Sequence, residues 1–104
     1  MIRKASVMYV YQDKFAEYKK RHDELWPEME QVLKEHGVSN YSIFLHEPTA
    51  MLFAYLEAES EEMHARIAQT ETCQRWWAYM KDIMQTNPDN SPVSEAMKEV
   101  FHLH

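Results

Sequence analysis

The chain has 104 residues and a net charge of −6 at pH 7, from 11 basic and 17 acidic side chains. This length allows a single domain, residues 1–104, and the acidic balance argues against binding to nucleic acid or an anionic membrane, since both are bound through clustered cations. One cysteine and one glycine exclude an intrachain disulfide, a thiolate zinc site and the glycine-rich loops that hold phosphates.

The first predicted elements are a strand and two helices. Residues 2–11 alternate like a β-strand, and a helical stretch follows from Asp13. Pro27 interrupts this stretch, so two helical pieces are expected, with Pro27 in the first turn of the second piece. Gly37 is expected to end that piece in a left-handed cap.

A β-hairpin comes next. Residues 40–46 and 50–58 predict two strands, and residues 47–49 form the turn between them. Ser60 and Thr70 each precede acidic residues, which is typical of a helix start.

The C-terminal part is expected to hold a helix, a loop and a strand. The helix that starts at Thr70 runs to about Met84, with Cys73, Trp77, Met80 and Met84 on one side. Residues 87–94 have the composition of a loop, and residues 96–103 predict a last strand.

The predicted order β-α-β-β-α-β is the ferredoxin-like arrangement of the α+β class. The strand at residues 50–58 is apolar on both faces, whereas two helices cover only one face of a four-stranded sheet. We therefore expect a homodimer whose sheets face each other across a two-fold axis, with pockets between helices and sheet.

The candidate catalytic residue is His22. It follows Tyr18 by four positions, so the two side chains lie one helical turn apart on the same face. Both belong to the stripe that should point inward, while Arg21, Asp23 and Glu24 keep the solvent face charged. Two interpretations remain open: a core histidine with a satisfied hydrogen bond, or an imidazole placed for proton transfer near neutral pH.

Trp76 and Trp77 are adjacent and point about 100° apart on a helix. Either one ring belongs to the core and the other to the rim, or both rings form a wall against the C–H face of a pyranose. Tyr41, Tyr9 and Tyr11 would extend such a wall.

Metal binding and thiol chemistry find little support. The histidines form no His-x-x-x-His or His-Glu-x-x-His pattern, so no metal site is expected. Cys73 has no activating partner in the sequence and is interpreted as a structural thiol. No apolar run approaches the roughly 18 residues of a membrane span, and the N-terminus lacks the apolar core of a signal peptide, so we expect a soluble, cytoplasmic protein.

Several short motifs together resemble the L-rhamnose mutarotase family over the full length of the chain. They are Tyr18-x-x-x-His22 followed by Trp26-Pro27-Glu28, His36-Gly37 leading to Asn40-Tyr41, Cys73-Gln74-Arg75-Trp76-Trp77, and the segment from Asn87 to Ser94. The resemblance implies a dimeric α+β barrel that interconverts the α and β anomers of L-rhamnose in the cytoplasm without a cofactor. His22 matches the family's proton donor, and four aromatic residues match its sugar-contacting positions: Tyr18, Tyr41, Trp76 and Trp77.

Mutarotation opens a hemiacetal: the anomeric hydroxyl loses a proton, the ring oxygen gains one, and the aldehyde re-closes on its other face. Nothing is oxidised and no phosphate moves, so neither metal nor nucleotide is needed. We expect His22, as imidazolium, to protonate the ring oxygen. The base stays open between a tyrosine, a carboxylate and a bound water.

Two other functions fit the expected fold. A cofactor-free monooxygenase would use a similar dimeric barrel with an aromatic-lined pocket. A non-catalytic sugar-sensing dimer would bind the sugar without speeding the exchange of its anomers. Fold alone does not separate these functions, because function lies in the site. The combined motifs favour the isomerase.

Overall fold

The computed structural model describes residues 1–104 as one sheet and one layer of helices. The strands are β1 (Ile2–Tyr9), β2 (Ser39–His46), β3 (Met51–Ala58) and β4 (Glu95–Met97). The helices are α1 (Phe15–Asp23), α2 (Pro27–Glu35), α3 (Glu61–Ile67) and α4 (Glu71–Met80). Each helical segment of the predicted order is thus a pair of short helices, and none of the helices is long and apolar enough to span a membrane.

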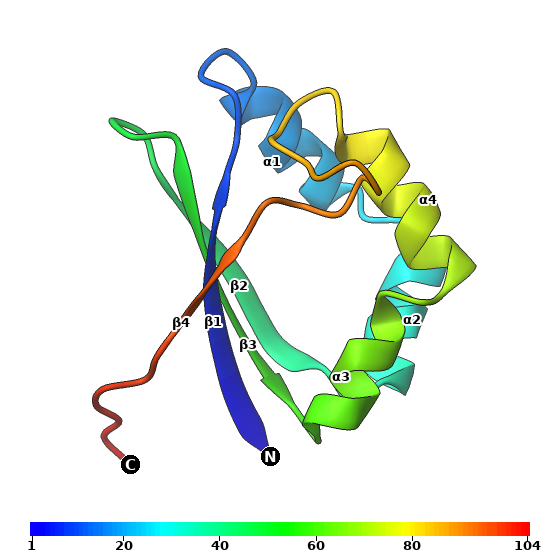
Figure 1. Ribbon diagram of the computed structural model, residues 1–104, viewed down its shortest axis with the longest axis vertical. Helices are drawn as coiled ribbons and strands as arrows, with labels where there is room; N and C mark the ends of the chain where they lie inside the picture. Colours follow the sequence, from blue (N-terminus) through cyan, green and yellow to red (C-terminus); the bar gives the residue numbers. More distant parts are fainter.

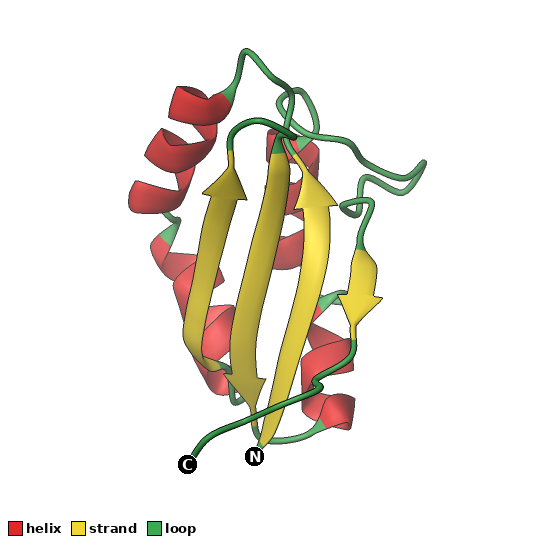
Figure 2. Ribbon diagram, turned by 90° about the vertical axis from the view of Figure 1, so that its left-hand side faces the viewer, coloured by secondary structure: helices red, strands yellow, loops and turns green.

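The sheet is antiparallel throughout, with the strand order β2-β3-β1-β4. It curves around the helices, which all lie against one of its faces (Figures 1 and 2). This order and layering are those of the ferredoxin-like α+β fold, so the predicted fold class is confirmed. No helix covers the second face, which we call the open face of the sheet (Figure 2).

Local sequence explains where the helices begin and end. Pro27 occupies the first turn of α2, and Gly37 follows that helix with a φ of +78°, as predicted. A Cβ at Gly37 would approach the Glu59 side chain to 2.8 Å, so the position requires glycine on steric grounds as well. The side chains of Ser60 and Thr70 accept hydrogen bonds from the amides three residues on, at 3.1 and 3.2 Å, which confirms both predicted starts.

The predicted end of α4 is wrong by about one turn. The helix ends at Met80, and the chain then turns back toward the first strand instead of continuing to Met84. The amide of Gln85 donates to the Tyr9 carbonyl at 2.9 Å, and Met84 pairs with Val10 in an isolated bridge. These contacts with β1 satisfy backbone groups that a longer helix would have satisfied internally.

The last strand is also much shorter than predicted. Of residues 96–103, only the start is extended, in the three-residue strand Glu95–Met97. The tail of residues 98–104 leaves the edge of β1 and crosses the lower end of the open face (Figure 2). There the side chains of Arg3 and Glu99 form an ion pair at 2.8 Å.

β3 shows how the two faces of the sheet differ. Its helix-facing residues are buried, each at most 9% exposed: Leu52, Ala54, Leu56 and Ala58. Met51, Phe53 and Tyr55 alternate with them on the open face and are partly exposed. Both faces of this strand are apolar, as the sequence predicts, but only one is covered within the chain.

Candidate functional site

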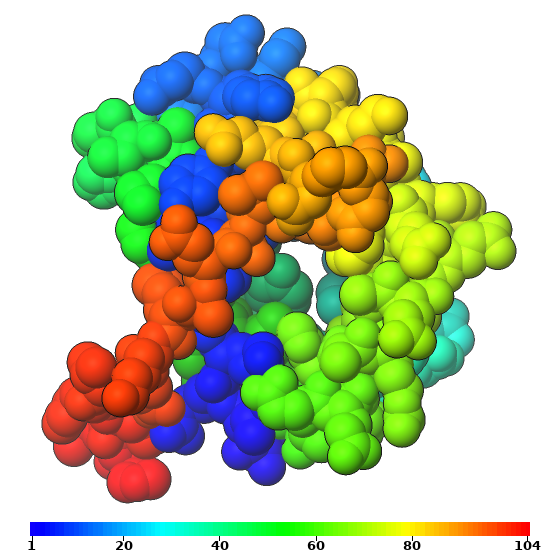
Figure 3. All heavy atoms as spheres, viewed as in Figure 1, coloured from blue at the N-terminus to red at the C-terminus, as the bar shows by residue number.

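A cavity of about 830 Å³ lies between the sheet and the helices. Figure 3 shows it as a hollow between the strands β1 and β4 on one side and the helices α3 and α4 on the other. Its volume falls within the range of small-molecule sites. All five predicted site residues line it: Tyr18, His22, Tyr41, Trp76 and Trp77. Side chains from α1, β2 and α4 therefore meet in one chamber.

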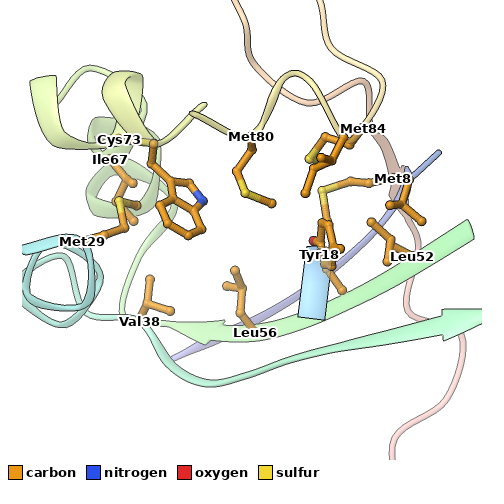
Figure 4. Close-up of a cluster of buried hydrophobic side chains, with 14 of the residues drawn as sticks. Met8, Tyr18, Met29, Val38, Leu52, Leu56, Ile67, Cys73, Met80 and Met84 are labelled. Atoms are coloured by element: carbon orange, nitrogen blue, oxygen red, sulfur yellow. The ribbon is translucent and has the colours of Figure 1, made fainter. Parts of the chain in front are cut away.

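Apolar side chains make up most of the cavity wall. Leu56 of β3 and Met80 at the end of α4 point toward each other across it (Figure 4). Met29 and Cys73 lie toward one end of this cluster, and Met8 lies toward the other. Because the wall offers few polar groups, those few decide what the cavity can do chemically.

Tyr18 and His22 project side by side from α1. Their rings are stacked, with centroids 4.3 Å apart and planes inclined by 26°. Tyr18 is buried, at 8% exposure, and burial raises the pKa of its phenol. The Tyr18 hydroxyl is therefore neutral near pH 7 and can donate a hydrogen bond into the cavity.

One hydrogen bond sets the tautomer of His22. Its Nδ1 lies 3.2 Å from the backbone oxygen of Tyr18, and a carbonyl oxygen only accepts, so Nδ1 carries the proton. Nε2 keeps a free lone pair on a side chain that lines the cavity. The interpretation of His22 as a core residue requires hydrogen bonds that satisfy the imidazole. In the structure only Nδ1 has a hydrogen-bond partner, and Nε2 has none.

Burial lowers the pKa of His22, and the Tyr18 hydrogen bond and the charge of Asp23 offset this only in part. Near neutral pH the imidazole is therefore mainly neutral. Its protonated form is a correspondingly stronger acid, so both forms lie within reach of a proton transfer.

The two tryptophans both reach the cavity, but with different burial. Trp76 is 7% exposed and stands edge-on to His22, with ring centroids 5.5 Å apart. Trp77 is half-buried beside it. Trp76 is thus the more buried of the two rings, a choice that the sequence left open because both positions fit a helical spacing between Cys73 and Met80.

Tyr41 lies across the cavity on β2. It follows Asn40, whose φ is +49°, within a register irregularity between Ser39 and Ser42. Such a bulge re-aims the neighbouring side chains, and Tyr41 lines the cavity although 42% of the residue is exposed. Desolvation of its hydroxyl raises the pKa of the phenol.

Two tyrosines do not join the predicted aromatic wall. The Tyr9 hydroxyl donates to Glu95 at 3.2 Å on the open face of the sheet, and Tyr11 is exposed. Neither side chain lines the cavity. The predicted residues that do form the aromatic wall are Tyr18, Tyr41 and the two tryptophans, and Phe15 lines the cavity with them.

Sequence reasoning missed several polar residues of the cavity lining. His64 of α3 is one, and burial lowers the pKa of its imidazole. Thr86 and Asn90 are others, from the segment after α4. The composition of residues 87–94 predicted a loop correctly, but no local signal says that this loop contributes to the cavity lining.

Other reactive groups are sparse. No three His, Cys, Asp or Glu side chains of residues 1–104 come together as a metal-ligand set. Cys73 lines the cavity as a neutral thiol, because burial raises its pKa to about 11. The arrangement can bind a small, partly apolar ring and exchange a proton with it through His22.

Comparison with known proteins points to one family. The family model of L-rhamnose mutarotase matches residues 3–103. An L-rhamnose mutarotase from Shouchella clausii is 61% identical over 103 residues, and one from Bacillus subtilis is 59% identical; each alignment covers 99% of both chains. The crystal structure of an L-rhamnose mutarotase from Formosa agariphila covers 100% of both chains at 45% identity, with a TM-score of 0.92.

A more distant likeness concerns the fold alone. A putative antibiotic biosynthesis monooxygenase from Nitrosomonas europaea has a TM-score of 0.65 at 16% identity, covering 97% of this chain and 100% of that chain. Proteins with this architecture thus carry different names, so this likeness shows the fold and not the function.

Proposed function

The chain belongs to the L-rhamnose mutarotase family, and we propose that it interconverts the α and β anomers of L-rhamnose in the cavity between its sheet and its helices. Such a protein is an isomerase acting on a carbohydrate. The observation that carries the proposal is the imidazole of His22, which presents one unpaired nitrogen to an aromatic-lined chamber.

The reaction moves two protons and one ring bond. On opening, the anomeric hydroxyl loses its proton and its oxygen forms the aldehyde C=O, while the bond from C1 to the ring oxygen breaks and the ring oxygen gains a proton. The aldehyde then turns about the C1–C2 bond. Closing reverses each step on the other face of the carbonyl, so every proton-transfer group ends as it began.

We assign the proton on the ring oxygen to His22. As imidazolium, Nε2 donates this proton during opening, and as neutral imidazole it takes the proton back during closing. The hydrogen bond from Nδ1 to the Tyr18 carbonyl holds the ring so that Nε2 is left for the substrate. The lowered pKa of His22 favours easy passage between the two forms.

The candidates for the base that takes the proton of the anomeric hydroxyl are a carboxylate of the lining and a bound water. Burial raises the pKa of both cavity tyrosines, which makes them donors rather than acceptors of protons. The carboxylates in the lining, Asp23 and Glu30, are each paired with a lysine, at 2.9 and 3.5 Å. The chamber is large enough to hold a water beside a sugar.

The aromatic side chains hold the sugar. Trp76 and Trp77 offer flat faces to the C–H groups of the pyranose, and the apolar wall accommodates the methyl group of a deoxy sugar. The hydroxyls of Tyr18 and Tyr41 are neutral donors for the sugar's oxygens.

We also propose that the protein is a homodimer, in which a second copy covers the open face of the sheet. Phe44, on that face, is 67% exposed, and Phe53 and Tyr55 lie beside it. A contiguous apolar patch of this kind is typical of an interface between protein chains. A cytoplasmic location fits the free thiol of Cys73, and the acidic charge disfavours nucleic acid as a partner.

The test of function is anomer exchange in L-rhamnose, followed by NMR saturation transfer. His22→Ala should lower the protein-catalysed rate by about 10²–10⁴-fold, because it removes the proton donor. His36→Ala is the matched control, because the His36 Nδ1 makes the same contact with the carbonyl four residues before it but the side chain does not line the cavity; this variant should exchange anomers at the wild-type rate.

Three outcomes would contradict the proposal. A His22→Ala protein with wild-type exchange would exclude His22 as the acid. A wild-type protein that binds rhamnose without speeding the polarimetric equilibration of freshly dissolved sugar would be a sensor, and oxygen uptake with a phenolic substrate would identify a monooxygenase.

A further inference from the structure

Arg21, the residue before His22, does not belong to the solvent face of α1. The sequence interpretation placed it on that face together with Asp23 and Glu24, but the Arg21 side chain is only 12% exposed. The structure places the guanidinium where α1 meets the C-terminal end of α4. The sequence interpretation of Arg21 as a solvated charge is therefore wrong.

The Arg21 side chain connects the two helices through several short contacts. Nη1 donates to the backbone oxygen of Tyr79 at 2.7 Å and to Oδ1 of Asp82 at 2.9 Å, and Nη2 donates to Oδ2 of Asp82 at 3.3 Å. The guanidinium also lies 4.4 Å from the centroid of the Tyr79 ring. On its own helix, Nε donates to Glu17 at 2.8 Å. Planar, forked donors of this kind hold their partners in a fixed geometry.

This connection meets a need of α4. The last carbonyls of a helix lack partners within it and carry negative partial charge, and α4 has no basic residue of its own in its last turn. Arg21 supplies that cation from α1. The two helices approach each other here through long side chains rather than through close backbone packing.

The two helices joined by Arg21 carry the two halves of the site. His22 is the next residue on α1, and Trp76 lies one turn before Tyr79 on α4. Trp76 in turn packs against Tyr79, with ring centroids 5.6 Å apart. A movement of Arg21 would therefore shift the His22 imidazole and the Trp76 ring relative to each other.

We infer that Arg21 is a positioning residue, which sets the placement of His22 relative to Trp76 by fastening α1 to the end of α4. The inference rests on the proposed function, because the placement matters only if a sugar held by the tryptophans receives a proton from His22. A displacement of about 1 Å between reacting groups can lower a rate by about 100-fold.

The main variant is Arg21→Met, which keeps the length of the side chain and removes every hydrogen bond. We expect kcat for anomer exchange to fall by about 10- to 100-fold, with a smaller change in KM, since the residues that hold the sugar remain. The NMR signals of the His22 imidazole should also shift, because they sense the neighbouring rings of Tyr18 and Trp76.

The matched control is Lys20→Met, the same change at the adjacent, exposed position of α1. It should leave both kcat and the His22 signals as they are in the wild type. A merely structural Arg21 would lower the melting temperature of Arg21→Met while the folded protein kept wild-type kcat and His22 signals, and that result would overturn the inference.

Two milder variants decide the matter if Arg21→Met does not fold. Arg21→Lys keeps the charge without the fork, and Asp82→Asn removes the charge of the exposed partner, whose side chain is 64% exposed. Wild-type kcat and His22 signals in both variants would overturn the inference. A wild-type protein without mutarotase activity would instead refute the proposed function, and the His22 signals would still report on the position of α1.

Discussion

Both faces of the sheet are apolar, but only one of them is covered by helices of the same chain. On the helix side, Leu52 is 2% exposed within the core, yet this same side also lines the cavity. On the open face, Phe44 is 67% exposed although its chemistry is equally apolar. Apolar residues therefore indicate that a surface has to be covered, but they do not say what covers it or whether the cover leaves space.

The helix side also combines packing and binding. Leu52 and Leu56 belong to the buried core and at the same time form part of the cavity wall. Aromatic side chains of α1 and α4 line the chamber and leave its interior open. The open face holds only a smaller hollow of about 330 Å³, between Tyr55 and the C-terminal tail. The two faces can therefore be separated by experiment.

The largest expected effect concerns the covered side. Leu52→Ala should lower the free energy of unfolding by about 2–5 kcal/mol, because it leaves a hole among buried side chains. Chemical denaturation measures this loss. Phe53→Ala, at the next position on the opposite face, is the matched comparison. An equal loss in both variants, independent of protein concentration, would show that the two faces are equally buried within one chain.

The open face should respond in its assembly instead. Phe44→Glu places a charge in the proposed interface, and we expect sedimentation to show a monomer where the wild type is a dimer. Far-UV circular dichroism should stay unchanged, since Phe44 contributes nothing to the helix side. Lys20→Glu, on the outer surface of α1, is a control that should stay dimeric. A monomeric wild type would remove the dimer from the proposal.

The smallest expected effect is the pH dependence of catalysis in the cavity on the covered side. Burial lowers the pKa of His22 from its ordinary value of about 6.5. As the acid, His22 reacts only when protonated, so the catalysed kcat/KM should rise as pH falls from 8 and level off below that lowered pKa. His64→Asn removes the other imidazole of the cavity lining and should leave the inflection of the pH profile in place, which would assign that inflection to His22. A rate that rises with pH would instead make Nε2 of His22 the base.

The same shift affects stability. Near its pKa, His22 binds fewer protons in the folded protein than in the unfolded chain, so protonation favours unfolding. The contribution of His22 to the free energy of unfolding is present above pH 6.5 or so and is lost as pH falls through the lowered pKa. Denaturation of wild type and His22→Ala across this range would show the difference.

Features with local causes could be predicted from the sequence. Pro27 and Gly37 bound α2 because the proline ring fixes φ in the first turn, while the missing Cβ of Gly37 allows the positive φ that follows the helix. Tyr18 and His22 share a helix face because they are four residues apart. The activity itself came from the resemblance carried by the combined motifs, since spacing alone left His22 open between core and catalysis.

Features with distant causes could not. Arg21 looks like any surface charge until α1 meets Tyr79 and Asp82, about sixty positions away. The choice between Trp76 and Trp77 as the buried ring depends on how α4 rotates against the other helices, and both positions satisfy the same spacing.

The size of the chamber has one more consequence. Starting sugar and finished sugar differ only in the handedness of a single carbon, and the open aldehyde between them needs room to swing one bond. A cavity that fitted one form tightly would bind that form and slow its release. A cavity of about 830 Å³ has room for both forms and for the rotation of the open chain. A catalyst of this shape brings the two sugars to their equilibrium mixture sooner and leaves the proportions of that mixture unchanged.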